Sequence, residues 1–196
     1  MMRILHALLV TVLLGAGAAF AAPAQVIFIR HAEKPDYGPE LSAQGFKRAD
    51  ALVNFFRTNP AVTRYGTPAA IFAAAPKNED SSVRSIQTVT PLAKALRLTI
   101  NADLTKGQTG KLIRAIMENP AYDGRMVLVC WQHEKLVEAA QTLAEYGGAA
   151  QAVYNAIPAV WPAAAFDRAW VLDLTGGKVV SFKNVPQRLL PGDSAR

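Results

Sequence analysis

Two histidines follow apolar runs of the sequence. His31 comes after VIFI and Arg30, and His133 comes after VLVCW and Gln132. A neutral imidazole is a nucleophile that can accept a phosphoryl group and so divide a hydrolysis into two easier steps. Arg84 lies at an expected helix start, and guanidinium groups match phosphate oxygens bidentately. These residue types together favour phosphoryl-group chemistry.

Other catalytic chemistries have weaker support. Zinc needs three or four ligands, and Cys130 and His133 are spaced so that they would point to opposite faces of a strand. The sequence contains no G-x-S-x-G motif, and GQTGKL at residues 107–112 lacks the leading glycine and the Ser or Thr of a phosphate-binding loop. We therefore expect neither a metal nor another cofactor.

The segments around these residues alternate between strand and helix patterns. Strands are expected at residues 24–29, 70–73 and 125–131, because each is a short apolar run. Residues 169–174 and 178–182 flank a Gly-Gly pair and predict a hairpin at the sheet edge.

Helices are expected after these strands. Ser42 predicts the N-cap of a helix that ends before Pro60. Its predicted buried face consists of Phe46, Ala49, Val53 and Phe56. A second helix starts at about Ser82, with Pro91 expected to kink or restart it. The inner side of this second helix is predicted to consist of Ile86, Val89, Ala93 and Leu96. Further helices are predicted over 109–117 and 134–146.

This alternation predicts an α/β fold, a three-layer αβα sandwich with a mostly parallel central sheet. In such sheets a ligand site lies beyond the carboxyl ends of the strands, at a switch in strand order. His31 and His133 both follow predicted strands directly, so we expect them to meet there.

Residues 1–21 have the pattern of a secretory signal peptide. Arg3 is followed by the apolar run LLVTVLL and by Ala19-Phe20-Ala21, an A-x-A cleavage site. An uncleaved anchor is the alternative, but the run is short for a membrane span. We expect export, to the periplasm or the medium, no stable membrane insertion after cleavage, and one domain over 22–196.

Composition indicates one ordinary core. The 196 residues are 51% hydrophobic and 18% charged, with a net charge of +6. That charge either favours anionic substrates or reflects a solvated surface. The basic residues are scattered, so nucleic-acid binding is not expected, and the single cysteine, Cys130, excludes an internal disulfide. The oligomeric state stays open.

Four blocks, in order, resemble branch 1 of the histidine phosphatase superfamily. They are RHAEKP after the first strand, LSAQGFKRA at 41–49, SSVRSIQT at 81–88 and VLVCWQH at 127–133. The resemblance covers residue 26 to about 140 and implies the phosphoglycerate-mutase-like fold. By this resemblance His31 is the nucleophile that becomes phosphohistidine, Arg30 and Arg84 bind phosphate, and His133 is the second histidine.

Three positions depart from the family pattern. Ala32 stands where the RHG motif has glycine, Arg48 replaces a common glutamine, and no residue clearly matches the asparagine that often follows RHG. Glu33 and Lys34 are interpreted as loop charges beside the site.

The proton donor is left open between Glu134, Glu79 and Asp80. Glu134 could equally stabilise a helix N-terminus, and the two loop acids could simply be solvated. Trp161 could line a pocket or cover the core.

The expected function is therefore that of an exported, metal-independent phosphatase, a phosphoric monoester hydrolase. Its substrate would be a small-molecule phosphomonoester, hydrolysed through a phosphohistidine at His31. A non-catalytic module that binds phosphate or another phosphoryl ligand is one alternative, and a phosphomutase is the other.

Overall fold

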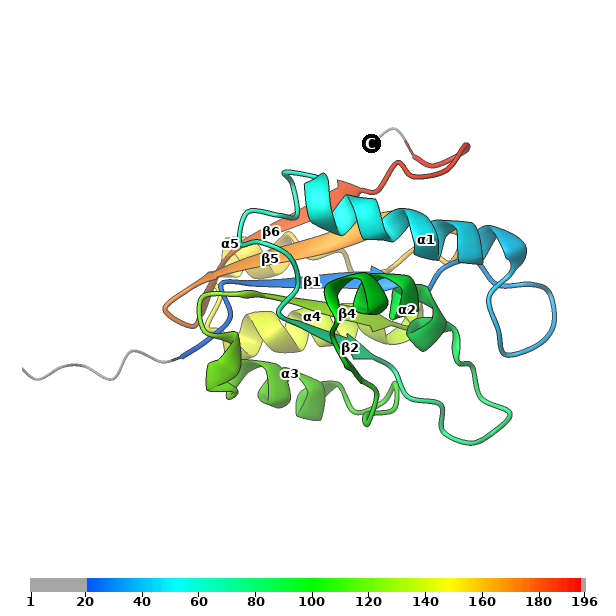
Figure 1. The fold of residues 1–196 in the computed structure, drawn as a ribbon. Coiled ribbons are helices and arrows are strands. Elements are labelled where there is room, and N and C mark those ends of the chain that lie inside the picture. The colour runs from blue at the N-terminus through cyan, green and yellow to red at the C-terminus, as the bar shows by residue number, and fades with distance from the viewer. Residues whose placement is uncertain (1–20, 195–196) are drawn as a thin grey trace, which may run out of the picture.

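The protein is built around a six-stranded sheet, which Figure 1 shows in a computed structural model that describes residues 21–194. The predicted signal peptide lies outside these residues, apart from Ala21. The strands stand in the order β3-β2-β4-β1-β5-β6. They are β1 (Gln25–Arg30), β2 (Ala70–Ala73), β3 (Ile100–Asn101), β4 (Met126–Trp131), β5 (Arg168–Thr175) and β6 (Lys178–Pro186). β1 to β4 are mutually parallel, whereas β5 and β6 are antiparallel, which confirms the predicted edge hairpin.

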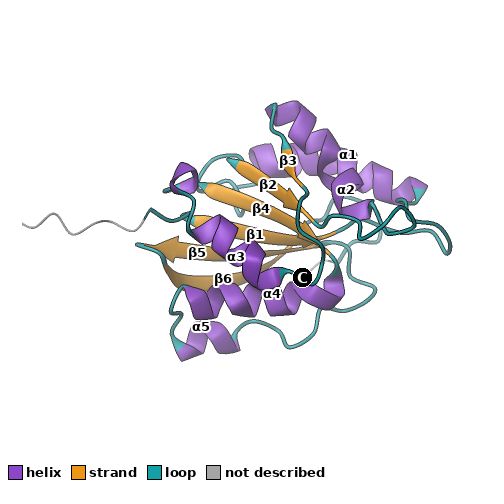
Figure 2. Ribbon diagram, turned by 90° about the horizontal axis from the view of Figure 1, so that it is seen from below, coloured by secondary structure: helices purple, strands orange, loops and turns teal. Residues whose placement is uncertain are grey.

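Helices cover both faces of the sheet, as Figures 1 and 2 show. One face carries α1 (Ala43–Thr58) and α2 (Arg84–Leu96). The other carries α3 (Thr109–Met117), α4 (His133–Tyr146) and α5 (Gln151–Asn155). A 3₁₀ turn, Pro120–Tyr122, precedes β4. No helix within residues 21–194 is both long and apolar enough to cross a membrane.

Alternate residues of β1 supply the two halves of the core. Ile27 and Ile29 pack with residues of α1 and α2, while Val26 and Phe28 pack with residues of α3 and α4. All six residues of β1 are buried, because the strand is central and has helices on both sides. The predicted three-layer α/β arrangement is confirmed.

Helix α1 begins as predicted but buries a different face. The Ser42 hydroxyl oxygen accepts a hydrogen bond from the Gly45 N–H at 3.1 Å, and this caps the helix. Phe46, predicted to be buried, is 44% exposed, and Val53 is only half-buried. The buried face consists instead of Gly45, Arg48, Ala49, Leu52, Phe55 and Phe56. The face is rotated because a charged residue, Arg48, lies within it.

Helix α2 also differs from its prediction. It starts at Arg84, two residues after Ser82, and continues through Pro91 without a break. Proline removes one helical hydrogen bond, but Val89, Leu92 and Ala93 around it are buried in the core, and this packing holds the helix together.

The connections diverge between β1 and β4. These strands are parallel neighbours, yet the chain leaves β1 for α1 on one face and leaves β4 for α4 on the other. Loops that depart in opposite directions leave a crevice at the carboxyl ends of the two strands, where open α/β sheets bind ligands.

Candidate active site

The backbone of the first candidate segment is fixed by the sheet. Arg30 is the last residue of β1 and is paired in register with Trp131 of β4. The His31 N–H continues this ladder by donating to the Trp131 carbonyl at 3.0 Å. His133 begins α4 two residues after Trp131, so both histidines lie at the crevice between the strands.

The His31 ring is buried and held in one tautomer. It is 4% exposed, and its Nδ1 lies 2.7 Å from the Ala32 carbonyl oxygen. Since a carbonyl only accepts, Nδ1 carries the proton and Nε2 keeps its lone pair. Burial lowers the His31 pKa to about 4; the bond to Ala32 opposes this, and the charges of Arg30, Arg84 and His133 add to it. The ring is therefore neutral at physiological pH.

Arg30 is a buried cation with a free donor. It is 2% exposed, its Nη1 donates to the Ala163 and Ala165 carbonyls, and its guanidinium lies 3.9 Å from the centre of the Phe166 ring. Burial lowers its pKa to about 10. Its Nε is buried and has no partner among the described residues. A buried donor without a partner is costly, so this atom favours an added acceptor such as a phosphate oxygen.

Arg84 is positioned by the loop that precedes α1. Its Nε donates to the Glu40 carbonyl at 2.8 Å and its Nη2 to the Gly38 carbonyl. Thr88, one helical turn later, donates to the Arg84 carbonyl at 2.7 Å and accepts from the Ala32 N–H at 2.8 Å. This buried threonine links the loop after His31 to the first turn of α2, a role that the sequence analysis missed.

The three candidate proton donors lie on different elements. Glu134 follows His133, is exposed, and pairs with Lys106 at 2.8 Å between Oε2 and Nζ. That hydrogen bond lowers the Glu134 pKa, and the Glu134 charge in turn raises the pKa of Arg30. Glu79 and Asp80 are exposed in the loop before α2.

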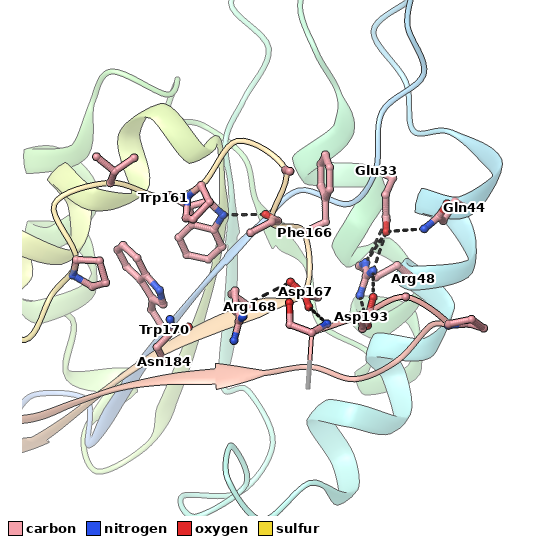
Figure 3. A pocket seen from close by; sticks show the side chains of 18 residues that line it. Glu33, Gln44, Arg48, Trp161, Phe166, Asp167, Arg168, Trp170, Asn184 and Asp193 are labelled. Carbon is pink, nitrogen blue, oxygen red and sulfur yellow. Dashed lines mark hydrogen bonds and ion pairs between the residues drawn. The ribbon is translucent and has the colours of Figure 1, made fainter. Parts of the chain in front are cut away.

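A buried charge cluster lies beside the crevice. Arg48 donates to both carboxylate oxygens of Glu33 and to both of Asp193, with Nη2 at 2.7 Å and 2.6 Å from the nearest oxygens (Figure 3). The Arg48 side chain is 3% exposed. Burial opposes ionisation of Asp193, but the hydrogen bonds from Arg48 and from the backbone hold its pKa at about 2. Glu33, expected as a loop charge beside the site, is part of this cluster.

A pocket of about 790 Å³ opens next to this cluster. As Figure 3 shows, Glu33, Arg48 and Asp193 lie at one end, and Trp161 and Trp170 at the other. Trp161 is 3% exposed and packs against Trp170, with the ring centres 4.6 Å apart and the ring planes tilted by 46°, so it both packs in the core and lines the pocket. The lining also includes Phe166, which contacts Arg30 and connects the pocket to the site.

The described residues contain no cluster suited to a metal ion, and Cys130 is a buried core residue. Among residues 21–194, no group of three or more His, Cys, Asp or Glu is arranged to hold a metal ion. Cys130 is fully buried, and burial raises the pKa of its thiol despite hydrogen bonds with Thr88 and Ser85. It therefore packs as a small apolar side chain, as expected.

Comparison with known proteins identifies solved structures that have a similar fold. No protein-family profile matches the sequence, and no curated protein matches it closely enough to count as a relative. Solved structures do match. The protein histidine phosphatase SixA in complex with tungstate is 13% identical, with a TM-score of 0.54 over 83% of this chain and 97% of SixA.

Two mycobacterial proteins are similar in the same way. A glucosyl-3-phosphoglycerate phosphatase has 13% identity and a TM-score of 0.51 over 83% of this chain and 97% of its own. A protein described as hydrolase 1 has 12% identity and a TM-score of 0.50 over 85% and 99%. The structural neighbours thus include phosphatases of the histidine phosphatase superfamily, and the expected phosphoglycerate-mutase-like fold is confirmed.

Proposed function

We propose that this chain is a histidine phosphatase that hydrolyses a small phosphomonoester through a phosphohistidine on His31. The observation that carries the proposal is the His31 ring, which is buried and neutral, with Nδ1 occupied by Ala32 and with Arg30 and Arg84 nearby. A neutral imidazole among fixed guanidinium groups is suited to attack a phosphate dianion. The structurally similar SixA was solved in complex with tungstate, an oxyanion, which supports the proposal that this protein binds phosphate.

In the first chemical step, the lone pair on His31 Nε2 forms a bond to phosphorus while the bond from phosphorus to the ester oxygen breaks. Arg30 and Arg84 stabilise the charge on the three equatorial oxygens. The buried Nε of Arg30 gains the acceptor that it lacks in the free protein. The departing oxygen takes a proton from an acid.

Glu134 is the donor that we propose. Of the three candidates it is the one whose charge acts on both Arg30 and His133. In the second step water attacks phosphorus, the phosphorus–nitrogen bond breaks, and the proton from water returns to Glu134. Inorganic phosphate leaves and His31 recovers its lone pair.

The test is hydrolysis of 4-nitrophenyl phosphate by residues 22–196, with EDTA present. We expect turnover by the wild type, a loss of at least three orders of magnitude in His31→Ala, and an acid-labile phosphoenzyme trapped by quenching at short times. Arg84→Ala should lose about 10²- to 10³-fold. Arg57→Ala, which removes an exposed arginine at the end of α1, is the matched control.

Turnover that survives in His31→Ala would overturn the phosphohistidine mechanism. If neither the wild type nor any variant hydrolyses the ester, but the wild type binds vanadate and Arg84→Ala does not, the protein is a phosphoryl-binding module instead.

The proton donor has a separate test. Glu134→Gln should lose about 10²- to 10⁴-fold on an alkyl phosphate, whose leaving group needs protonation, and far less on the nitrophenyl ester. Glu79→Gln and Asp80→Asn should leave that difference unchanged.

Export of the protein is likewise a proposal, supported by the sequence of residues 1–21.

A further inference from the structure

A second cavity, of about 480 Å³, lies along the carboxyl ends of β2 and β4. Its walls come from the loop between β2 and α2, the loop between β3 and α3, and the residue that follows β4. The polar and charged side chains that line it are Lys77, Ser81, Ser82, Thr105, Lys106 and Gln132.

Three of the lining residues connect this cavity to the proposed phosphoryl site. Gln132 directly precedes His133. The Ser82 hydroxyl oxygen lies 3.4 Å from both the backbone nitrogen and Nη1 of Arg84. Lys106 is bonded to Glu134, the proposed proton donor. A phosphate held by Arg84 would therefore lie beside this cavity.

The charge of the lining is entirely positive. Two lysines and three hydroxyl groups line the cavity, and none of its lining residues is acidic. Within residues 21–194, no carboxylate forms an ion pair with Lys77, and the one paired with Lys106 is exposed Glu134. The larger pocket differs, because Glu33, Asp167 and Asp193 outnumber its two arginines.

We propose that the cavity between Lys77 and Lys106 binds an anionic group, a carboxylate or a second phosphate, on the organic half of the substrate. The inference rests on the proposed function, because it assigns the leaving group of that reaction. Ammonium groups on flexible stems match such oxyanions, and the Ser82 hydroxyl can donate a further hydrogen bond. The hydroxyls of Ser81 and Thr105 already donate to the side-chain oxygens of Asn78 and Gln108.

Occupation of the cavity has a consequence for the proton donor. Lys106 would turn from the Glu134 carboxylate to the anion of the substrate. The hydrogen bond that lowers the Glu134 pKa would then be lost, and Glu134 would hold its proton more readily. An anionic leaving group would thus assist its own protonation.

The test compares two esters that differ only in charge, 4-(carboxymethyl)phenyl phosphate and its carboxamide. Phosphate release gives kcat/KM for each. We expect the wild type to prefer the carboxylate by about tenfold, and each of Lys77→Ala and Lys106→Ala to reduce that ratio by about threefold to fivefold, the range for partly solvated ion pairs. The preference should also fall as salt is added.

Three comparisons keep the interpretation specific. Lys77→Ala does not touch Glu134, so its effect on the ratio reports on binding of the anion alone. Lys106→Arg keeps the charge and should retain most of the preference. Lys135→Ala breaks an exposed ion pair with Glu138 on α4, outside the cavity, and should leave the ratio unchanged.

The outcomes separate the two proposals. Equal kcat/KM for the two esters, or a ratio that both lysine variants leave intact, overturns this inference while the phosphatase function stands. Failure of both esters and of 4-nitrophenyl phosphate to turn over overturns the function, and this inference with it.

Discussion

Replacement of Arg48 by methionine tests how the charge cluster beside the site is held together. Arg48→Met keeps most of the side-chain volume but leaves Glu33 and Asp193, whose side chains are 13% and 6% exposed, without their shared cation. Removal of one partner from a buried ion pair typically costs about 3–5 kcal/mol, because the remaining charge is uncompensated.

The lowered pKa of Asp193 also indicates that its charged form is stabilised in the folded protein, by Arg48 and by backbone N–H groups. The carboxyl falls from its ordinary 3.8 to about 2 in the folded protein, which corresponds to about 2 kcal/mol at neutral pH. In the wild type this stabilisation is present above pH 4 and is lost as the pH falls through 2. In Arg48→Met the sign reverses, since the buried Asp193 carboxyl loses its cation while the Glu33 carboxylate stays beside it. The Asp193 pKa then rises, and the variant regains stability as the pH falls from 7 to 5.

Urea unfolding, followed by tryptophan fluorescence at pH 7 and pH 5, measures both effects. We expect a loss of at least 3 kcal/mol at pH 7 that shrinks by about 1 kcal/mol or more at pH 5. Lys135→Met, which breaks an exposed pair, should lose less than about 1 kcal/mol. Adding Glu33→Gln and Asp193→Asn to Arg48→Met should restore most of the loss. A loss under about 1 kcal/mol, or one that is equal at both pH values, would refute this reasoning.

Three further predictions concern other parts of the structure. Gly45→Ala should destabilise the protein by about 2 kcal/mol in urea unfolding, because the added Cβ would overlap the Glu33 carbonyl oxygen. In the control, Gly110→Ala on α3, the added Cβ contacts no other atom, so this variant should gain up to ~1 kcal/mol of stability. Equal effects of the two substitutions would contradict the close approach of Gly45 to Glu33. The His31 pKa is 6.5 in the unfolded chain and about 4 in the folded protein, so the unfolded chain takes up the proton first as the pH falls. Between pH 7 and pH 4 the free energy of unfolding of the wild type should therefore fall by about 3 kcal/mol more than that of His31→Gln. Parallel pH profiles of the two proteins would exclude this. Cys130 should react with a thiol reagent only after unfolding, and rapid labelling of the native protein would show that it is accessible.

The fold was largely predictable from local sequence patterns. β2 and α3 have the predicted bounds, β1 begins and ends one residue later than predicted, and β4 begins one residue later. Buried parallel strands are continuous apolar runs, so their positions are visible without tertiary information. β3, with two residues, and α5, with five, are too short to leave such a pattern and were not predicted.

Site residues that directly follow a strand could be predicted from the sequence, whereas those placed by contacts between distant parts of the chain could not. Arg30, His31, Arg84 and His133 are brought together as expected, although their roles stay predictions. Thr88 was visible only as a residue one turn after Arg84.

The face of α1 shows the limit more clearly. A count of apolar residues favours Phe46, but the helix turns Arg48 inward because its carboxylate partners come from positions 15 and 145 residues away. No local pattern carries that information.

The division between strand ends and loops has a consequence for how this protein can change. The His31 backbone is locked to Trp131 by the sheet ladder, whereas Lys77 and Lys106 belong to loops that connect other strands. Exchange of exposed side chains in these two loops leaves the ladder untouched, since surface connections tolerate variation. Insertions next to residue 105 would instead disturb the Ala75–Thr105 bridge and the hydrogen bond from Trp131 Nε1 to the Lys106 carbonyl. The proposed chemical step can therefore be kept while the range of accepted esters is varied, which makes residues 77–81 and 106–107 natural positions for a library aimed at new specificities.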